Sequence, residues 1–232
     1  IRPWNSTAIM KHGVESVHKK EDIIMTQLIE ALSYPFVQRA IAAGVMISLC
    51  AALLGVILVL KQYSLIGHGL GDVGFASTSL AVALGLPVMA VSIPIVVIAA
   101  CLIMFWSQRS KTGGDTAIGM VATGALSIGV IITAMSSGFN VDVNGYMFGS
   151  ILAMSREDVI FSVVLSIVIL VLFVVFYNRL FLITFDENFA KASGIRVGFY
   201  QFLIALLTAL TVVMGMRMMG SLLISSLIIF PA

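Results

Sequence analysis

The stretch Ser64–Leu84, SLIGHGLGDVGFASTSLAVAL, places an ionisable pair, His68 and Asp72, among glycines and small or apolar residues. If the stretch is helical, their i, i+4 spacing puts the imidazole and the carboxylate on one face. A helix of about 20 mainly apolar residues is long enough to cross the hydrocarbon core of a membrane. Ionisable residues in such segments are costly, and they usually face a bundle interior or a water-filled path. The pair is therefore the first candidate for a functional site.

The composition of the whole chain indicates a membrane protein. Of its 232 residues, 60% are hydrophobic and 10% are charged, whereas a soluble domain carries about 25% charged residues. The mean hydropathy is +1.11. Such a chain cannot cover its surface with polar groups, so we expect lipid to be its solvent. The formal net charge of +2 gives no sign of nucleic-acid binding.

Long apolar runs predict an all-α, polytopic membrane fold with about seven spans. The last of these runs stops at the end of the chain and is too short to cross, so we expect the chain to be incomplete at its C-terminal end. The predicted spans are Phe36–Leu60, Leu65–Leu84, Val88–Trp106, Thr116–Met135, Val159–Phe176, Phe199–Met216 and Gly220–Ala232.

The N-terminal segment differs from the rest of the chain, because charged side chains are frequent between Ile1 and Asp22. The segment lacks the apolar core of a signal peptide, and Met25 would make a natural start. We therefore expect residues 1–24 to be a polar, disordered extension and residues 25–232 to form the transmembrane domain. Leu28–Phe36 could add a short interfacial helix.

Basic residues in short loops predict the orientation, because they favour the cytoplasmic side. One side of the predicted spans carries more of them than the other, and we place that side in the cytoplasm and the N-terminal segment outside. The basic residues of the N-terminal segment itself argue for the reverse. The basic residues on the proposed cytoplasmic side are Lys61, Arg109, Lys111, Arg179, Lys191 and Arg196.

Two of the predicted loops carry structure of their own. In the outer loop, the apolar portion Tyr146–Met154 is too short to span a membrane, which is typical of an interfacial or re-entrant helix. In the inner loop, Asp186 can cap a short helix, Glu187 suits its first turn, Lys191 its last, and Gly194 its C-terminal stop. Such a helix is either a docking handle for a soluble partner or a simple interfacial helix.

The chain also contains a series of motifs in a fixed order. They are VLKQYSLIGHGLGD (Val59–Asp72), GGDTAIGM (Gly113–Met120), GYMFGSILAMSREDV (Gly145–Val159), and FDENFAKASGIRV (Phe185–Val197) followed by GSLLISSLIIFPA (Gly220–Ala232). Each motif alone is a soft pattern, and their combination is specific. Through them the chain from about Met25 onward resembles the permease subunits of bacterial ABC importers for zinc, manganese and iron chelates.

The resemblance implies a multi-pass subunit in a bacterial plasma membrane. It would act as a homodimer with separate cytoplasmic ATP-binding subunits and an extracellular metal-binding lipoprotein, and it would perform no covalent chemistry and hold no permanent cofactor. The family's capped cytoplasmic helix couples to the ATPase, so Asp186, Glu187, Ala190 and Gly194 are the expected coupling residues. Complete members continue with a further span beyond the final Pro-Ala pair, in line with an incomplete chain.

The chain departs from the family pattern at its ionisable pair. Members usually show an aspartate followed four residues later by a histidine, in a GDxxSH-like stretch that is associated with the metal path. Here His68 comes first and Asp72 second, so the residue types are kept in reversed order. Both still project from one helix face, and we expect them to line the metal path. The reversal leaves the choice of metal open.

The chemistry of the pair limits the substrate without reference to the family. Imidazole with carboxylate suits Zn²⁺ or Mn²⁺, with Fe²⁺ as a further candidate, whereas Ca²⁺ and Mg²⁺ prefer oxygen ligands alone. Two ligands are too few for tight zinc binding, but a two-fold dimer would supply two pairs. Weak binding suits conduction, because an ion held too tightly does not leave. The alternative is a buried hydrogen bond between His68 and Asp72 that joins two helices.

The small residues around the pair have two interpretations. Gly67 and Gly71 form a small-xxx-small pair that lets another helix approach closely. Alternatively, the backbone unwinds there and offers carbonyl groups to a cation. The methionines clustered between Met214 and Met219 indicate packing in the membrane core rather than a site for Cu(I), the soft ion that thioethers favour.

The sequence therefore predicts the permease subunit of an ATP-driven metal importer. No Gly-x-x-x-x-Gly-Lys-Ser/Thr phosphate loop occurs in it, so ATP hydrolysis must come from another chain. The alternative is a stand-alone secondary transporter in which His68 and Asp72 also exchange protons. An intramembrane metal enzyme is disfavoured, because the sequence has no His-Glu-x-x-His motif and no nucleophile–base set.

Overall fold

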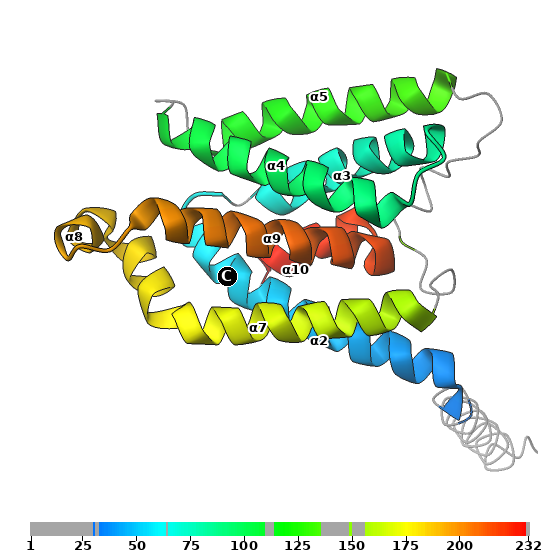
Figure 1. Ribbon diagram of the computed structural model, residues 1–232, viewed down its shortest axis with the longest axis horizontal. Helices are drawn as coiled ribbons and strands as arrows, with labels where there is room; N and C mark the ends of the chain where they lie inside the picture. Colours follow the sequence, from blue (N-terminus) through cyan, green and yellow to red (C-terminus); the bar gives the residue numbers. More distant parts are fainter. Residues whose placement is uncertain are drawn as a thin grey trace, which may run out of the picture. The chain divides into compact units, whose positions relative to one another are not determined.

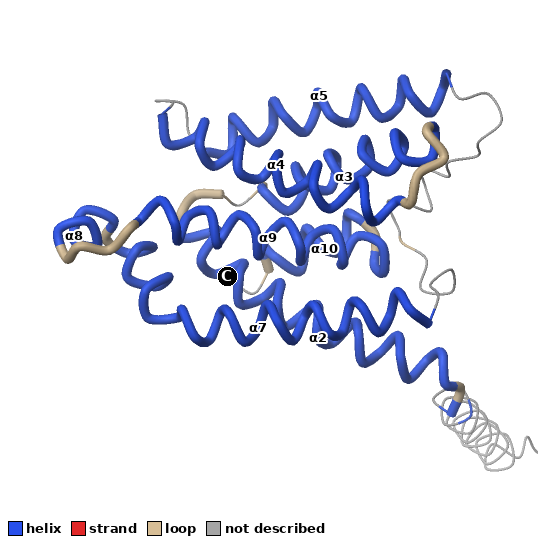
Figure 2. Tube along the Cα trace, in the orientation of Figure 1, coloured by secondary structure: helices blue, strands red, loops and turns tan. Residues whose placement is uncertain are grey.

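The computed structural model describes Glu30 and residues 33–63, 65–109, 114–135, 149 and 156–230. The regular structure of this part of the chain is entirely helical (Figure 2), which confirms the predicted all-α class. The helices are α2 (Pro35–Leu60), α3 (Ile66–Ala83), α4 (Val88–Arg109), α5 (Gly114–Met135), α7 (Arg156–Phe185), α8 (Glu187–Ala192), α9 (Val197–Met219) and α10 (Ser221–Ile229). The extension 1–24, part of Leu28–Phe36, and the predicted helix Tyr146–Met154 apart from Gly149 lie outside the described residues.

The helices α2, α4, α5, α7 and α9 are long and apolar enough to cross a membrane, and they coincide with predicted spans. The other predicted spans are present as α3, with 18 residues, and α10, with nine. Glycine, serine and threonine lower the hydropathy of α3, and most of its residues are buried among other helices. Helix α3 therefore belongs to the interior of the bundle more than to its lipid-facing surface.

The chain divides into two compact units, residues 1–42 and 43–232, and α2 runs through the boundary. The described part of the first unit is the start of α2 with the residues just before it. There the rings of Tyr34 and Phe36 lie 5.9 Å apart. All further description concerns the second unit.

Helix α3 is the most enclosed element of the second unit. In the view of Figure 1, α4 crosses α3, with α5 above them and α9 and α10 below, and α3 contacts all four helices. Hydroxyl groups join it to its neighbours: Thr133 of α5 donates to Ser79 at 3.1 Å, and Thr78 pairs with Ser92 of α4 at 3.4 Å. Such interhelical hydroxyl bonds are typical of helices that pack within a membrane.

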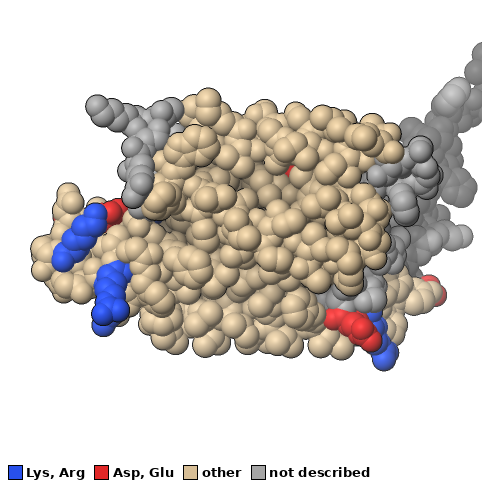
Figure 3. All heavy atoms as spheres, turned by 45° about the horizontal axis from the view of Figure 1, so that its top comes forward, with Lys and Arg blue, Asp and Glu red and all other residues tan. Residues whose placement is uncertain are grey.

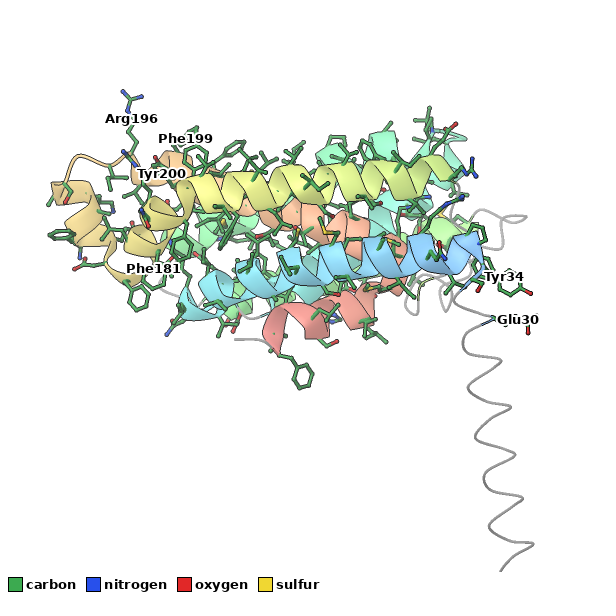
Figure 4. The ribbon with its side chains drawn as sticks, turned by 90° about the horizontal axis from the view of Figure 1, so that it is seen from below. Glu30, Tyr34, Phe181, Arg196, Phe199 and Tyr200 are labelled. Carbon is green, nitrogen blue, oxygen red and sulfur yellow. The ribbon has the colours of Figure 1, made fainter. Side chains whose placement is uncertain are left out.

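Helix α7 is longer than the predicted span Val159–Phe176. Its 30 residues correspond to about 45 Å, whereas the hydrocarbon core is about 30 Å thick. The polar residues after Phe176 end the apolar run but do not end the helix, because an exposed helix tolerates them. Along this continuation the rings of Tyr177, Phe181 and Phe185 follow one another at 5.7 and 4.4 Å. Figure 4 shows Phe181 pointing away from the ribbon.

Charged side chains lie mainly at the two ends of the described helices. Figure 3 shows charged side chains of both signs at each end of the face in view, with a band between them that is uncharged except for a small acidic spot. One end carries Lys191 of α8 and Arg196 before α9, and the other carries Arg156 and Glu157 at the start of α7. This distribution is that of a protein whose middle band faces lipid.

Candidate functional site

The structure brings His68 and Asp72 together on α3. His68 Nε2 lies 3.7 Å from Asp72 Oδ2, as the i, i+4 spacing predicts. The two side chains differ in exposure: half of the His68 side chain is exposed, whereas only 12% of the Asp72 side chain is. Their separation exceeds a hydrogen bond, and both belong to one helix. The arrangement is therefore not the buried bond between two helices that the sequence left open as an alternative.

The spacing of the two side chains suits a shared metal ion. Two ligands of a tetrahedral Zn²⁺ lie about 3.4 Å apart when each bond is about 2.1 Å long, which is close to the observed 3.7 Å. The imidazole supplies nitrogen and the carboxylate oxygen, a combination that fits Zn²⁺, Mn²⁺ or Fe²⁺. Among the described residues, no group of three or more His, Cys, Asp and Glu side chains gathers to complete such a site. Within the described residues of one copy, the pair therefore supplies two ligands.

The first turn of α3 is fixed by a neighbouring helix. Asp115, in the first turn of α5, accepts a hydrogen bond from the backbone N–H of Leu65 at 3.1 Å. This bond satisfies one of the N–H groups that a helix start leaves without an intrahelical partner. The sequence predicted no role for Asp115, although it is the aspartate of the GGD stretch directly before the fourth predicted span, which was the available signal.

The glycines beside the pair face two different helices. A Cβ atom at Gly67 would lie 2.9 Å from Ile228 Cδ1, and one at Gly71 would lie 3.1 Å from Ser221 Cβ, so both face α10. A Cβ atom at Gly69 would lie 2.5 Å from Ile118 Cγ2 of α5. The backbone is helical from Ile66 onward. These glycines therefore lie where other helices approach closely, in unbroken helix.

The short helix predicted in the inner loop is present as α8, with the expected caps. Asp186 Oδ1 accepts a hydrogen bond from the N–H of Phe189 at 2.9 Å. At the other end, Gly194 has φ +76°, and the N–H groups of Gly194 and Ile195 donate to the carbonyls of Lys191 and Ala190. These two bonds make the αL helix ending that favours glycine.

The side chains of α8 divide between the protein and the solvent. Ala190 is fully buried. In contrast, Phe189 is 57% exposed, and Phe185, just before the helix, is 63% exposed. Glu187 bonds to Lys191 within α8 and to Gln201 of α9. The sequence analysis did not identify Gln201, although it is an amide within an apolar run, which is a usable signal.

Comparison with known proteins identifies the family. The sequence model of the ABC 3 transport family matches residues 33–232. The chain belongs to the ABC 3 transport family. The resemblance found in the motifs is thereby confirmed, and as an ABC 3 permease the chain is a multi-pass transport component and not an enzyme.

Relatives of this ABC 3 permease include metal transport proteins. A manganese transport system membrane protein of Halalkalibacterium halodurans is 29% identical over 202 residues, which cover 87% of this chain and 69% of the relative. A high-affinity zinc uptake system membrane protein of Haemophilus influenzae is 31% identical over 197 residues, covering 83% and 74%. The structure of PsaBC from Streptococcus pneumoniae in complex with Fab matches with a TM-score of 0.75 and 28% identity, covering 88% of this chain and 74% of that one.

Proposed function

We propose that this ABC 3 permease imports a divalent transition metal, with Mn²⁺ or Zn²⁺ as the substrate and Fe²⁺ as a further candidate. The observation that carries the proposal is the contact of His68 with Asp72, which sets a nitrogen and an oxygen ligand 3.7 Å apart on α3. Relatives that are named for manganese and zinc transport support it. The metal is cargo, bound only in passing.

A homodimer would make the site adequate for transport. One pair offers two ligands, and a second copy related by a two-fold axis would bring two more to the same path. Four ligands are what Zn²⁺ favours. Because each copy contributes only a part, the ion would be released when the two pairs move apart. This fits the requirement that conduction sites bind weakly enough to let the ion leave.

Helix α8 is proposed to couple the permease to a cytoplasmic ATP-binding subunit. The caps Asp186 and Gly194 stabilise the two ends of α8, and the buried Ala190 packs the helix against the rest of the chain. The exposed rings of Phe185 and Phe189 are the apolar contacts that a partner could cover. An extracellular metal-binding lipoprotein would deliver the ion on the opposite side of a bacterial plasma membrane. We keep residues 25–232 as the transmembrane domain and 1–24 as an extension.

Transport by membrane vesicles tests the proposal. Uptake of Mn²⁺ should require both ATP and the co-expressed ATP-binding subunit, because the chain has no phosphate loop of its own. His68→Ala and Asp72→Ala should each reduce uptake to background while the protein stays in the membrane at wild-type amounts. Wild-type uptake by both variants would remove the pair from the metal path.

The energy source separates the importer from a secondary transporter. In vesicles without ATP, an imposed proton gradient should give no Mn²⁺ uptake. Uptake that follows the gradient and ignores the ATP-binding subunit would favour the proton-coupled alternative. Glu157→Ala is the control for the uptake variants and should keep wild-type uptake, because Glu157 is exposed at the start of α7, away from α8.

A further inference from the structure

The side chain of Glu187 is held from within the protein. Its Oε1 accepts a hydrogen bond from Lys191 Nζ at 2.7 Å, and its Oε2 accepts one from Gln201 Nε2 at 3.2 Å. Lys191 belongs to α8 and Gln201 to the second turn of α9. Both carboxylate oxygens are therefore engaged, although 39% of the side chain stays exposed. A carboxylate bound in this way is poorly placed to be a principal contact for another chain.

The hydrogen bond with Glu187 also satisfies the buried side-chain amide of Gln201. Gln201 is only 7% exposed, and it lines a cleft of about 550 Å³ between α4 and α9 whose other walls are apolar side chains and glycine. A buried amide that lacks a partner is costly, so its N–H group favours the nearest acceptor. The acceptor is the carboxylate of Glu187. The bond thus joins α8 to a membrane-spanning helix and satisfies the buried amide of Gln201.

A third group near Glu187 is Lys61, at the end of α2. Burial lowers the pKa of its ammonium group, the carboxylate of Glu187 opposes that shift, and the ammonium of Lys191 adds to it. Lys61 thus lies within the electrostatic reach of both charged groups of α8. Helix α2 ends immediately afterwards with two backbone hydrogen bonds, from Gln62 N to Val59 O and from Tyr63 N to Leu58 O.

Helix α2 ends directly after Lys61. Gln62 adopts a φ of +60°, the left-handed conformation that ends many helices, and Tyr63 is buried. The next helix, α3, begins at Ile66, and His68 lies in its first turn. The end of α2 and the metal-path pair are therefore close in sequence.

From these contacts we propose that Glu187 is a positioning residue, which fastens α8 to Gln201 of α9. Movement of α8 would then carry the start of α9 with it. The inference rests on the proposed role of α8 in coupling, and it gives contact with the ATP-binding subunit to the exposed rings of Phe185 and Phe189 instead of Glu187. Sequence analysis had grouped Glu187 with the direct coupling residues.

Hydrogen exchange tests the attachment without reference to transport. In the full chain in lipid nanodiscs, Glu187→Ala and Gln201→Ala should each speed exchange of the α8 amides by about tenfold, because the same bond is lost from either side. Glu187→Gln keeps an oxygen for Gln201 Nε2 and should fall between these variants and the wild type. Glu157→Ala should leave α8 unchanged. Wild-type exchange in both alanine variants would overturn the proposal.

Transport distinguishes positioning from docking. Glu187→Ala and Gln201→Ala should each lower the maximal rate of ATP-dependent Mn²⁺ uptake by about fivefold. The Mn²⁺ concentration for half-maximal uptake should not change, and the ATP-binding subunit should still co-purify. The double variant should have the same maximal uptake rate as Glu187→Ala alone.

Loss of the subunit in Glu187→Ala but not in Gln201→Ala would make Glu187 a docking contact and overturn the proposal. A wild-type complex without ATP-dependent uptake would instead refute the proposed function, and the exchange result would still stand.

Discussion

At the scale of single residues, the two members of the metal-path pair have different surroundings. His68 is half exposed in the first turn of α3, and Asp72 is nearly enclosed one turn further along. His68 thus lies nearer the Lys61 end of α3, which the basic residues predict to be cytoplasmic, and Asp72 lies one turn further from that end. In the order that is usual for the family, the carboxylate would take the exposed position. The reversal therefore changes which ligand lies nearer that end, while both ligands stay on one helix face.

Exchanging the two residues tests whether that order matters. We expect His68→Asp combined with Asp72→His to retain Mn²⁺ uptake, because the double variant keeps one nitrogen and one oxygen ligand on the same face. Each single substitution duplicates one ligand type, and it should lower uptake by at least about tenfold, the scale of losses that follow removal of even outer partners of a metal site. Competition between Mn²⁺ and Zn²⁺ in uptake assays would show whether the double variant prefers a different metal. Loss of all uptake in the double variant would show that the order itself is required.

At the scale of helices, the bundle depends on glycines at two close approaches. A Cβ atom at Gly55 of α2 would overlap the backbone carbonyl of Ile228 in α10, and the glycines of α3 meet α10 and α5 in a similar way. Without a hydrophobic force between helices in lipid, close contact of this kind is a main source of association. The short helix α10 is thereby held between α2 and α3, next to the metal-path pair.

A substitution at Gly55 should destabilise the protein. Gly55→Ala forces α2 and α10 apart, and overpacking of this kind costs about 1–3 kcal/mol. Gly124 is the matched control, because nothing lies within 4 Å of its Cβ position on exposed α5, and alanine favours a helix over glycine. Thermal unfolding in detergent should show a lower midpoint for Gly55→Ala and an unchanged or higher one for Gly124→Ala. Equal midpoints for the two variants would contradict the close approach of α2 and α10.

The existence of the helices could be predicted from the sequence more fully than their contacts. Apolar runs located α2, α4, α5 and α9 closely, and cap residues located α8, because both signals are local. The extension of α7 beyond Phe176 was missed, since the prediction followed the thickness of the membrane and not the helix itself. The bond between Glu187 and Gln201 joins residues 14 positions apart on different helices. Only the packing of α8 against α9 brings them together, and no local pattern contains that information.

At the scale of the whole molecule, the distribution of basic residues predicts how the permease lies in the membrane. The α8 end carries Lys61, Arg179, Lys191 and Arg196, whereas the opposite end carries fewer basic residues and the acidic Glu157. Basic residues near membrane ends favour the cytoplasm. An ATP-binding subunit that docks on α8, as proposed, would also place this end in the cytoplasm, where ATP is available. Charge and the proposed coupling role thus predict the same orientation.

Labelling of single cysteines in intact cells tests this orientation. In a background with Cys50→Ala and Cys101→Ala, Glu157→Cys should react with a membrane-impermeant maleimide added outside, because the start of α7 would be extracellular. Arg196→Cys, at the start of α9, should react at least about tenfold more slowly, since the hydrocarbon core excludes a charged reagent. Permeabilising the cells should make both react equally, because both side chains are exposed. Rapid labelling of Arg196→Cys in intact cells would place α8 outside. That outcome would remove α8 from any contact with a cytoplasmic ATPase, and the coupling role proposed for it would fail with the orientation.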